Sequence, residues 1–131
     1  MYTISLKTKS GDSIQDITHA VAPVVAKSGI KEGFCLVSSP HTTAGITVNE
    51  NSDPDVKSDI LMELGKIVPL TDNYRHMEGN SAAHLKASLM GFSAVIPVSS
   101  GKIVLGIWQG IYFCEFDGPR ERKVNITVTG S

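Results

Sequence analysis

Residues 111–129 read IYFCEFDGPRERKVNITVT and carry the clearest signals for the fold. Over 123–129, apolar residues alternate with polar ones, the period-two pattern of a strand with one buried face. Residues 111–116 form an apolar run that predicts a second strand, and Asp117-Gly118-Pro119 between the two is typical of a turn. The stretch therefore predicts two consecutive strands separated by a turn.

More strands are predicted on the N-terminal side of this stretch. Tyr2, Ile4 and Leu6 alternate with polar residues, and Ser10-Gly11-Asp12-Ser13 is expected to follow that strand as a turn. Gln109-Gly110 is expected to be another turn, directly before the strand at 111–116. The expected strands cover residues 2–7, 33–39, 43–49, 92–98, 102–108, 111–116 and 123–129.

Three segments show helical signals. From Asp16 onward, apolar residues recur at helical spacing until Gly29, although Pro23 inside this segment disfavours a regular helix. Asp53 and Pro54 are typical of a helix start, and that helix is expected to end before Pro69. A third helix is predicted over 81–90, capped by Asn80 or Ser81 and ended by Gly91.

The order of these elements indicates the fold class. About seven strands and three helices are expected, with the strands grouped toward the C-terminal end. Such grouping is typical of an α+β fold in which helices cover one face of a mainly antiparallel or mixed sheet. The chain has 131 residues and shows no repeat or linker, so residues 1–131 are expected to form a single domain.

Composition excludes several classes of protein. Twelve Lys and Arg against thirteen Asp and Glu give a net charge of −1, which argues against a nucleic-acid partner. No apolar stretch approaches the ~20 residues that cross a bilayer, and the N-terminus lacks the pattern of a secretory signal. Cys35 and Cys114 lie in apolar surroundings without metal-ribbon spacing. We therefore expect a cytoplasmic protein with reduced thiols and no membrane partner.

His41 is the first candidate for a functional group. It lies in the segment SSPHTTAG (38–45), between two expected strands. Loops on a rigid scaffold often carry binding and catalytic side chains. The alternative is that His41 only satisfies backbone groups in a tight turn.

The segment NYRHMEGNSAAH (73–84) is richer in chemistry. If Asn80 caps the third helix, His84 lies one turn later, close to free N–H groups that favour an anion such as phosphate. His76 and Glu78 approach from the preceding loop, and two imidazoles with a carboxylate suit either a divalent metal or acid–base work. The alternative is a solvated polar loop followed by a capped helix.

A third candidate region combines two arginines with an amide. Arg120 and Arg122 are two residues apart, so they point to the same face if the strand begins at Arg120. Arginine is well suited to bidentate contact with phosphate, although a solvated surface cluster is the alternative. We expect Trp108 to pack in the core, and Gln109 beside it to present an amide at a pocket rim.

Three motif blocks in this order resemble the YjbQ-type family, often labelled secondary thiamine-phosphate synthase. The matching segments are PHTTAG (40–45) with NEN (49–51), YRHMEGN (74–80) with AHLKA (83–87), and GIWQ (106–109) with FDGPRER (116–122). The resemblance spans nearly the whole chain. It departs at Ile107, where threonine would be expected.

The resemblance implies a compact α/β sandwich that assembles as a homotrimer. It also implies a site, at a subunit junction or within one subunit, that gathers His41, His76, His84, Asn80, Gln109 and Arg120. The implied reaction joins a pyrimidine diphosphate to a thiazole phosphate, giving thiamine phosphate and pyrophosphate.

Roles for the site residues follow from their chemistry. Arg120, Arg122 and the helix start at Asn80 are expected to hold phosphate oxygens of a small phosphorylated molecule. The three histidines, His41, His76 and His84, are expected to bind a divalent metal, zinc or magnesium, or to donate a proton as pyrophosphate leaves, and Glu78 to orient an imidazole. The alternative from another class is a non-catalytic trimeric module that binds a metal or an anion.

Overall fold

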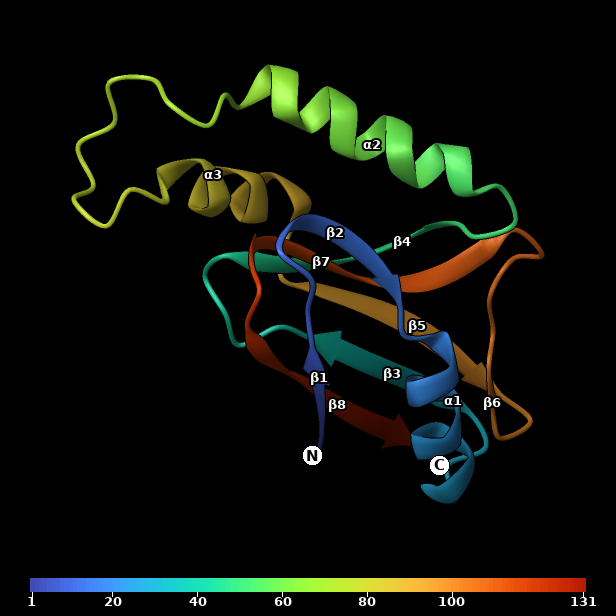
Figure 1. Cartoon of the computed structure of the whole chain (residues 1–131). Helices are drawn as coiled ribbons and strands as arrows, with labels where there is room; N and C mark the ends of the chain where they lie inside the picture. Colours follow the sequence, from blue (N-terminus) through green and yellow to red (C-terminus); the bar gives the residue numbers. More distant parts are fainter.

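The computed structural model describes all 131 residues as eight strands and three helices in one α+β domain (Figure 1). The elements in chain order are β1 (Tyr2–Lys7), β2 (Gly11–Asp16), α1 (Thr18–Lys27), β3 (Gly33–Ser38), β4 (Ala44–Glu50), α2 (Pro54–Ile67), α3 (Ser81–Met90), β5 (Ser93–Ser99), β6 (Lys102–Ile103), β7 (Gln109–Gly118) and β8 (Glu121–Gly130). The three expected helices are confirmed, and Asp53 caps α2 by accepting a hydrogen bond from the Asp55 N–H at 2.9 Å.

The strands form two antiparallel sheets rather than the single sheet expected from the sequence. The larger sheet, sheet A, has the order β1-β8-β3-β5-β6, and the smaller, sheet B, has the order β2-β7-β4. The consecutive strands β7 and β8 therefore lie in different sheets, and the turn at 119–120 crosses between them. Apolar side chains from both sheets form the main core, with Phe113, Val37 and Ile126 among its fully buried members.

Helix α1 is inserted into this core at one end of the sheets. Its residues Val21 and Val25 are fully buried, and the Ile17 N–H donates to the Ile111 carbonyl at 2.8 Å. Pro23 lies inside the helix, but on its exposed side. The proline ring therefore costs the helix one hydrogen bond without disturbing the buried face.

Helix α3 covers the outer face of sheet B. The small residues Ala83 and Ala87 let the helix approach Tyr112, Cys114 and Phe116 of β7 closely. Helix α2 lies farther out (Figure 1), and its half-buried Leu61 and Leu64 pack against the edge of this second cluster. None of the α2 residues is fully buried. The helices therefore cover one sheet of a sandwich, with α1 at its end.

Two expected turns and one expected strand are wrong. Residues 11–16 form β2, paired with β7, because Ile14 packs on the second cluster and the turn is shorter than predicted. Residues 104–108 leave the sheet after the two-residue β6, and β7 begins at Gln109 instead of following it. The Gln109 side chain closes this loop by accepting a hydrogen bond from the Gly106 N–H at 2.7 Å. Trp108 is 59% exposed and does not pack in the core.

Both cysteine thiols are buried in central strands. Cys35 lies in β3 of sheet A and Cys114 in β7 of sheet B, and neither is disulfide-bonded. Burial raises the pKa of Cys35 to about 11 and that of Cys114 to about 12. The two thiols are therefore protonated core side chains, as the sequence predicts.

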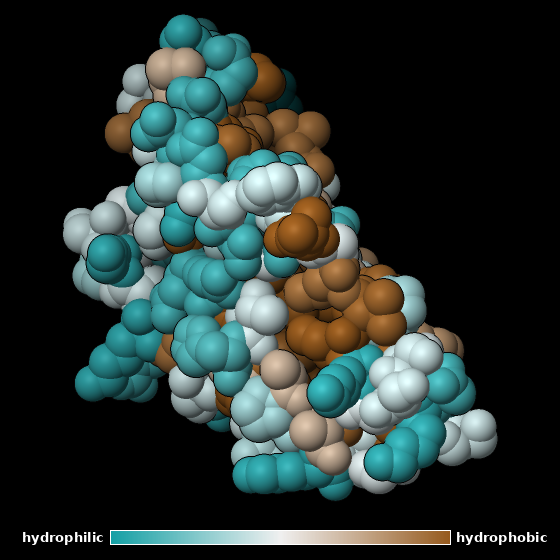
Figure 2. Space-filling model, turned by 90° about the vertical axis from the view of Figure 1, so that its right-hand side faces the viewer, coloured by the Kyte–Doolittle hydropathy of each residue, from teal (hydrophilic) through white to brown (hydrophobic).

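Large apolar side chains also remain on the surface. On the outer face of sheet A, Val95 is 63% exposed, and Phe34 and Leu36 lie on neighbouring positions of β3. The face shown in Figure 2 carries a hydrophobic hollow framed by hydrophilic side chains.

None of the helices combines the length and the apolar composition that a membrane crossing requires.

Candidate functional site

A polar cavity of about 290 Å³ opens where the β3–β4 loop, the β7–β8 turn and the start of α3 meet. It is lined by Pro40, His41, Thr42, Thr43, Glu78, Asn80, His84, Arg120 and Arg122. All three regions singled out in the sequence contribute to this lining. The structure therefore brings together most of the predicted site residues.

Arg122, which lines this cavity, belongs to a buried ion pair with Glu115. The Arg122 guanidinium donates from Nε to Glu115 Oε1 at 2.7 Å and from Nη2 to Glu115 Oε2, and both side chains are at least 95% buried. Nη2 also donates to the Thr43 hydroxyl at 2.8 Å, while Nη1 makes no hydrogen bond within the chain. The ion pair holds Arg122 in one orientation and leaves Nη1 without a hydrogen-bond partner.

Glu115 stays ionised in this buried position. Burial by itself raises the pKa of the carboxyl group, but hydrogen bonds from Arg122, Thr8 and the Asp117 N–H outweigh it and lower the pKa below the ordinary value of 4.5. Sequence reasoning missed Glu115. The available signal was a single acidic residue within the apolar run 111–116.

His41 is oriented by the backbone of β8. The Lys123 N–H donates to His41 Nε2 at 2.9 Å, which assigns the ring proton to Nδ1. Partial burial and the positive charge of Arg122 lower the pKa of His41 below 6.5. At neutral pH the ring is therefore uncharged, and its Nδ1–H makes no hydrogen bond within the chain.

Arg120 and Asn80 form a second polar cluster around Asp117. Arg120 Nη2 lies 2.9 Å from Asp117 Oδ2 and 3.9 Å from Glu78 Oε2, and Asn80 Nδ2 donates to both carboxylates. Burial raises the pKa of Asp117, but hydrogen bonds from Asn80 and Arg120 lower it overall. The guanidinium is about half exposed, so its charge remains accessible from the cavity.

The start of helix α3 contributes further donors. Asn80 occupies the cap position but makes no side-chain capping bond, and the N–H groups of Ser81 and Ala82 have no partner within the chain. Asn80 Oδ1 is buried and also unpartnered. A helix start with free N–H groups attracts anions, because these groups and the helix dipole both present positive charge.

His84 lines this cavity and two neighbouring ones. It also lines a cavity of about 380 Å³ with His41 and Phe92, and one of about 400 Å³ with His76 and Arg75. The rings of His76 and His84 meet edge to face, with centroids 5.3 Å apart. No three His, Cys, Asp or Glu side chains of the chain come together in a metal-binding arrangement. The chain therefore does not by itself bring His41, His76 and His84 together as a three-ligand metal site.

Two predicted site residues, His76 and Gln109, do not line the polar cavity. His76 lies in the neighbouring cavity beside His84, whereas Gln109 lies far away. It begins β7, whereas the cavity lies at the other end of this ten-residue strand. Phe116 of β7 donates its N–H to the carbonyl of the cavity residue Thr43, and the seven residues from Gln109 to Phe116 span roughly 23 Å at about 3.3 Å per residue. Gln109 shapes the 106–109 loop through its hydrogen bond with Gly106 and does not reach the cavity.

Proteins with similar sequences align with this chain over almost its full length. A family model described as "UPF0047 protein YjbQ-like" matches residues 2–131. The UPF0047 protein YugU of Bacillus subtilis is 50% identical over 98% of both chains, and the UPF0047 protein MJ1081 of Methanocaldococcus jannaschii is 45% identical over 99% of this chain and 94% of its own.

Solved structures show the same fold. A crystal structure from Clostridium acetobutylicum, described as an uncharacterized conserved protein of the YjbQ/UPF0047 family, is 54% identical, covers 98% of this chain and 100% of its own, and has a TM-score of 0.96. A YbjQ-like protein of unknown function from Sulfolobus solfataricus is 36% identical over 99% of this chain and 97% of its own, with a TM-score of 0.91. None of these names states an activity.

Proposed function

The chain belongs to the UPF0047 family of YjbQ-like proteins, and we propose that it is an enzyme acting on a small phosphorylated molecule at the polar cavity between His41, His84 and Arg120. The observation that carries this proposal is the set of unpartnered hydrogen-bond donors at one cavity and at the helix start beside it. Arg122 Nη1, His41 Nδ1 and the N–H groups at the start of α3 all lack partners within the chain. Phosphate oxygens accept several hydrogen bonds at once and suit such a set.

The proposed reaction is the one that the family resemblance implies. A thiazole phosphate attacks the methylene carbon of a pyrimidine diphosphate through its ring nitrogen. A C–N bond forms, the C–O bond to the diphosphate breaks, and pyrophosphate leaves with the electron pair. Negative charge therefore accumulates on the leaving group, and fixed donors that face it stabilise the transition state.

The residues have distinct tasks in this reaction. Arg120 and the start of α3 bind the leaving pyrophosphate, and the neutral His41 donates a hydrogen bond from Nδ1. His84, which lines three neighbouring cavities, donates a proton to the departing oxygen. Glu78 lies beside Arg120 and orients it. A divalent ion, if bound, would supply further positive charge to the pyrophosphate, but one subunit does not hold three ligands for it.

The test measures thiamine phosphate by mass spectrometry after incubation with both substrates. We expect His84→Ala and Arg120→Ala each to lower kcat/KM by about 100-fold or more, because each removes a group that acts on the leaving pyrophosphate. His19→Ala, on the exposed side of α1, and Lys102→Ala, in β6, are the matched controls and should keep the wild-type rate. Turnover that persists in both site variants would show the catalytic assignment to be wrong.

The edge-to-face pair of His76 and His84 favours a second candidate, a non-catalytic module that binds a metal or an anion. Metal analysis of the purified protein and calorimetric titration with pyrophosphate separate the two candidates. Pyrophosphate binding without turnover, or bound zinc that His76→Ala removes, would favour the module. Turnover that survives treatment with a chelator would favour the enzyme without metal.

We further propose that the chain assembles as a homotrimer through apolar surface such as the outer face of sheet A. Val95 and Phe34 are exposed there, and a contiguous apolar surface of this kind is typical of an interface. Assembly would also give Gln109 and the exposed Trp108 a place against a neighbouring subunit.

A further inference from the structure

Strand β1 is an open edge of sheet A. It pairs with β8 on one side and has no strand on the other. The Thr8 N–H donates to the Arg120 carbonyl at 3.0 Å, so the hydrogen-bonded pairs of this ladder fall on even-numbered residues of the strand. The N–H and C=O groups of Thr3, Ser5 and Lys7 therefore point away from β8 and remain free to pair with another strand.

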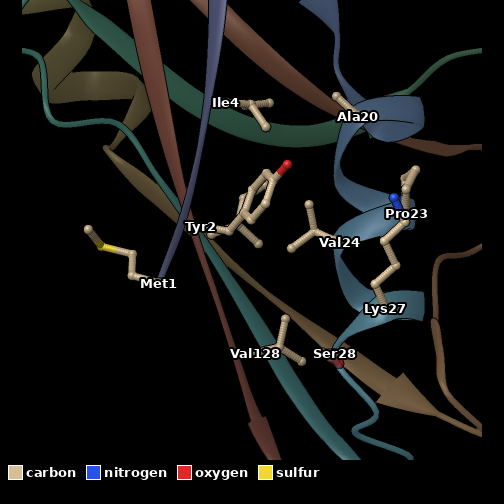
Figure 3. A pocket seen from close by; sticks show the side chains of 10 residues that line it. Met1, Tyr2, Ile4, Ala20, Pro23, Val24, Lys27, Ser28 and Val128 are labelled. Atoms are coloured by element: carbon tan, nitrogen blue, oxygen red, sulfur yellow. The ribbon is translucent and has the colours of Figure 1, made fainter.

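An apolar groove lies beside this free edge. A cavity of about 410 Å³ separates β1 from helix α1, and seven of the ten residues that line it are hydrophobic. Figure 3 shows Tyr2 and Ile4 of β1 facing Val24 of α1 across this space, with Val128 of β8 at its floor. The groove thus offers backbone partners on one wall and apolar contacts on the other.

The edge lacks the features that usually prevent strand pairing. Edge strands are commonly protected by charged side chains, proline or bulges. Residues 2–6 contain no charge and no proline, and the register with β8 is continuous from Tyr2 to Lys7. This part of β1 is therefore suited to accept a further strand.

Lys27 adds an electrostatic preference. It lies in the last turn of α1, lines the groove and forms no ion pair within the chain. In Figure 3 its side chain runs along the helix toward Pro23. A carboxylate of a bound segment would meet this ammonium group at the rim of the groove.

We propose that the groove between β1 and α1 binds an extended peptide segment of a partner protein as an added strand of sheet A. Backbone hydrogen bonds to Thr3 and Ser5 supply affinity, as in other cases of strand addition to a sheet edge. Every second side chain of the segment points into the groove and is apolar, since side chains alternate along a strand. An acidic residue of the segment pairs with Lys27.

Selection from a random seven-residue peptide library tests this proposal. We expect enriched peptides with apolar residues at alternate positions and at least one acidic residue. Ser5→Pro removes an outward N–H without touching a β1–β8 hydrogen bond, and proline is tolerated at such edge positions. Fluorescence polarisation with an enriched, labelled peptide should show binding at least tenfold weaker for Ser5→Pro and for Lys27→Glu.

Lys102→Glu is the matched control, because it makes the same charge change at the opposite edge of sheet A. It should bind the peptide as the wild type does, and a peptide with lysine in place of its acidic residue should recover affinity for Lys27→Glu. Circular dichroism and thermal unfolding verify that each variant folds. The proposal is overturned if no peptide is enriched, if the folded Ser5→Pro variant binds equally well, or if Ser5→Pro instead abolishes self-association of the wild-type protein.

Discussion

At the scale of single residues, the ion pair between Glu115 and Arg122 is central to the polar cavity. Glu115→Gln would leave the buried guanidinium without its counter-charge, and breaking a buried pair in this way typically costs about 3–5 kcal/mol. We expect a loss of this size in the free energy of unfolding, measured with urea at pH 7. Glu121→Gln, an exposed change on β8, is the control. Equal unfolding midpoints for the two variants would contradict the prediction.

The Glu115 carboxylate also predicts that the stability of the folded protein depends on pH in the acidic range. Because the pKa of Glu115 is lowered in the folded protein, its contribution to stability is complete above its unfolded value, near 4.5. This contribution is lost as the pH falls through the lower folded pKa. Urea unfolding below pH 4.5 should therefore show a steeper loss of stability in the wild type than in Glu115→Gln. Parallel curves for the two proteins would count against this assignment.

His41 predicts a separate effect near neutral pH. Its folded pKa lies below 6.5, so the unfolded chain binds more protons as the pH falls past 6.5, and stability decreases in that range. Protonation also removes the acceptor of the Lys123 N–H. We expect NMR titration to give a His41 midpoint below 6.5, identified by the resonance that His41→Gln lacks. A midpoint above 6.5 would contradict both the pKa direction and the neutral role given to this ring.

Among the secondary-structure elements, helix α2 depends most on its own capping residue, because it buries none of its residues completely. Asp53→Ala should cost about 1 kcal/mol, because it removes the cap of a helix that buries none of its residues completely. Hydrogen exchange should show faster exchange of the α2 amides and little change in the central strands. Asp59→Ala, exposed in the middle of the same helix, is the control. Equal exchange rates in the two variants would show that the cap contributes nothing.

The elements that could be predicted from the sequence are those whose signals lie close together along the chain. Capping residues and regular periodicity lie within a few residues of each other, so α2, α3, β1 and β8 follow from the sequence. The edge strand β2 and the loop 104–108 depend on distant partners. Ile14 finds its place against β7 and α3, and the loop is closed by the Gln109 side chain. Local patterns carry no information about such pairings.

The candidate site was predictable to a similar extent. His41, His84, Asn80, Glu78, Arg120 and Arg122 line one cavity, as their polar, turn-flanked settings suggest. The difference in burial and in ion-pair partners between Arg120 and Arg122 was not predictable. Arg122 is buried against Glu115, whereas Arg120 remains about half exposed beside Asp117. The difference arises because β8 turns Arg122 into the space between the sheets, and only the tertiary structure shows that β7 and β8 belong to different sheets.

At the scale of the whole molecule, the exposed outer face of sheet A predicts assembly. One chain has a mass of 14.0 kDa, so light scattering should give about three times that mass for the proposed homotrimer. Val95→Glu places a charge on the apolar face and should lower the measured mass. Thr71→Glu, in the exposed loop after α2, is the control and should leave it unchanged. A wild-type protein that stays monomeric at high concentration would contradict the assembly proposal.

Labelling of the two buried thiols would report the order in which the two sheets open. Cys35 is in the centre of one sheet and Cys114 in the centre of the other, so a thiol-reactive reagent labels each only when its own sheet opens. Equal labelling rates would mean that the sandwich opens as one cooperative unit, because neither sheet separates first. Faster labelling of Cys114 would identify the three-stranded sheet, with α2 and α3 on its outer side, as the first part of the fold to open.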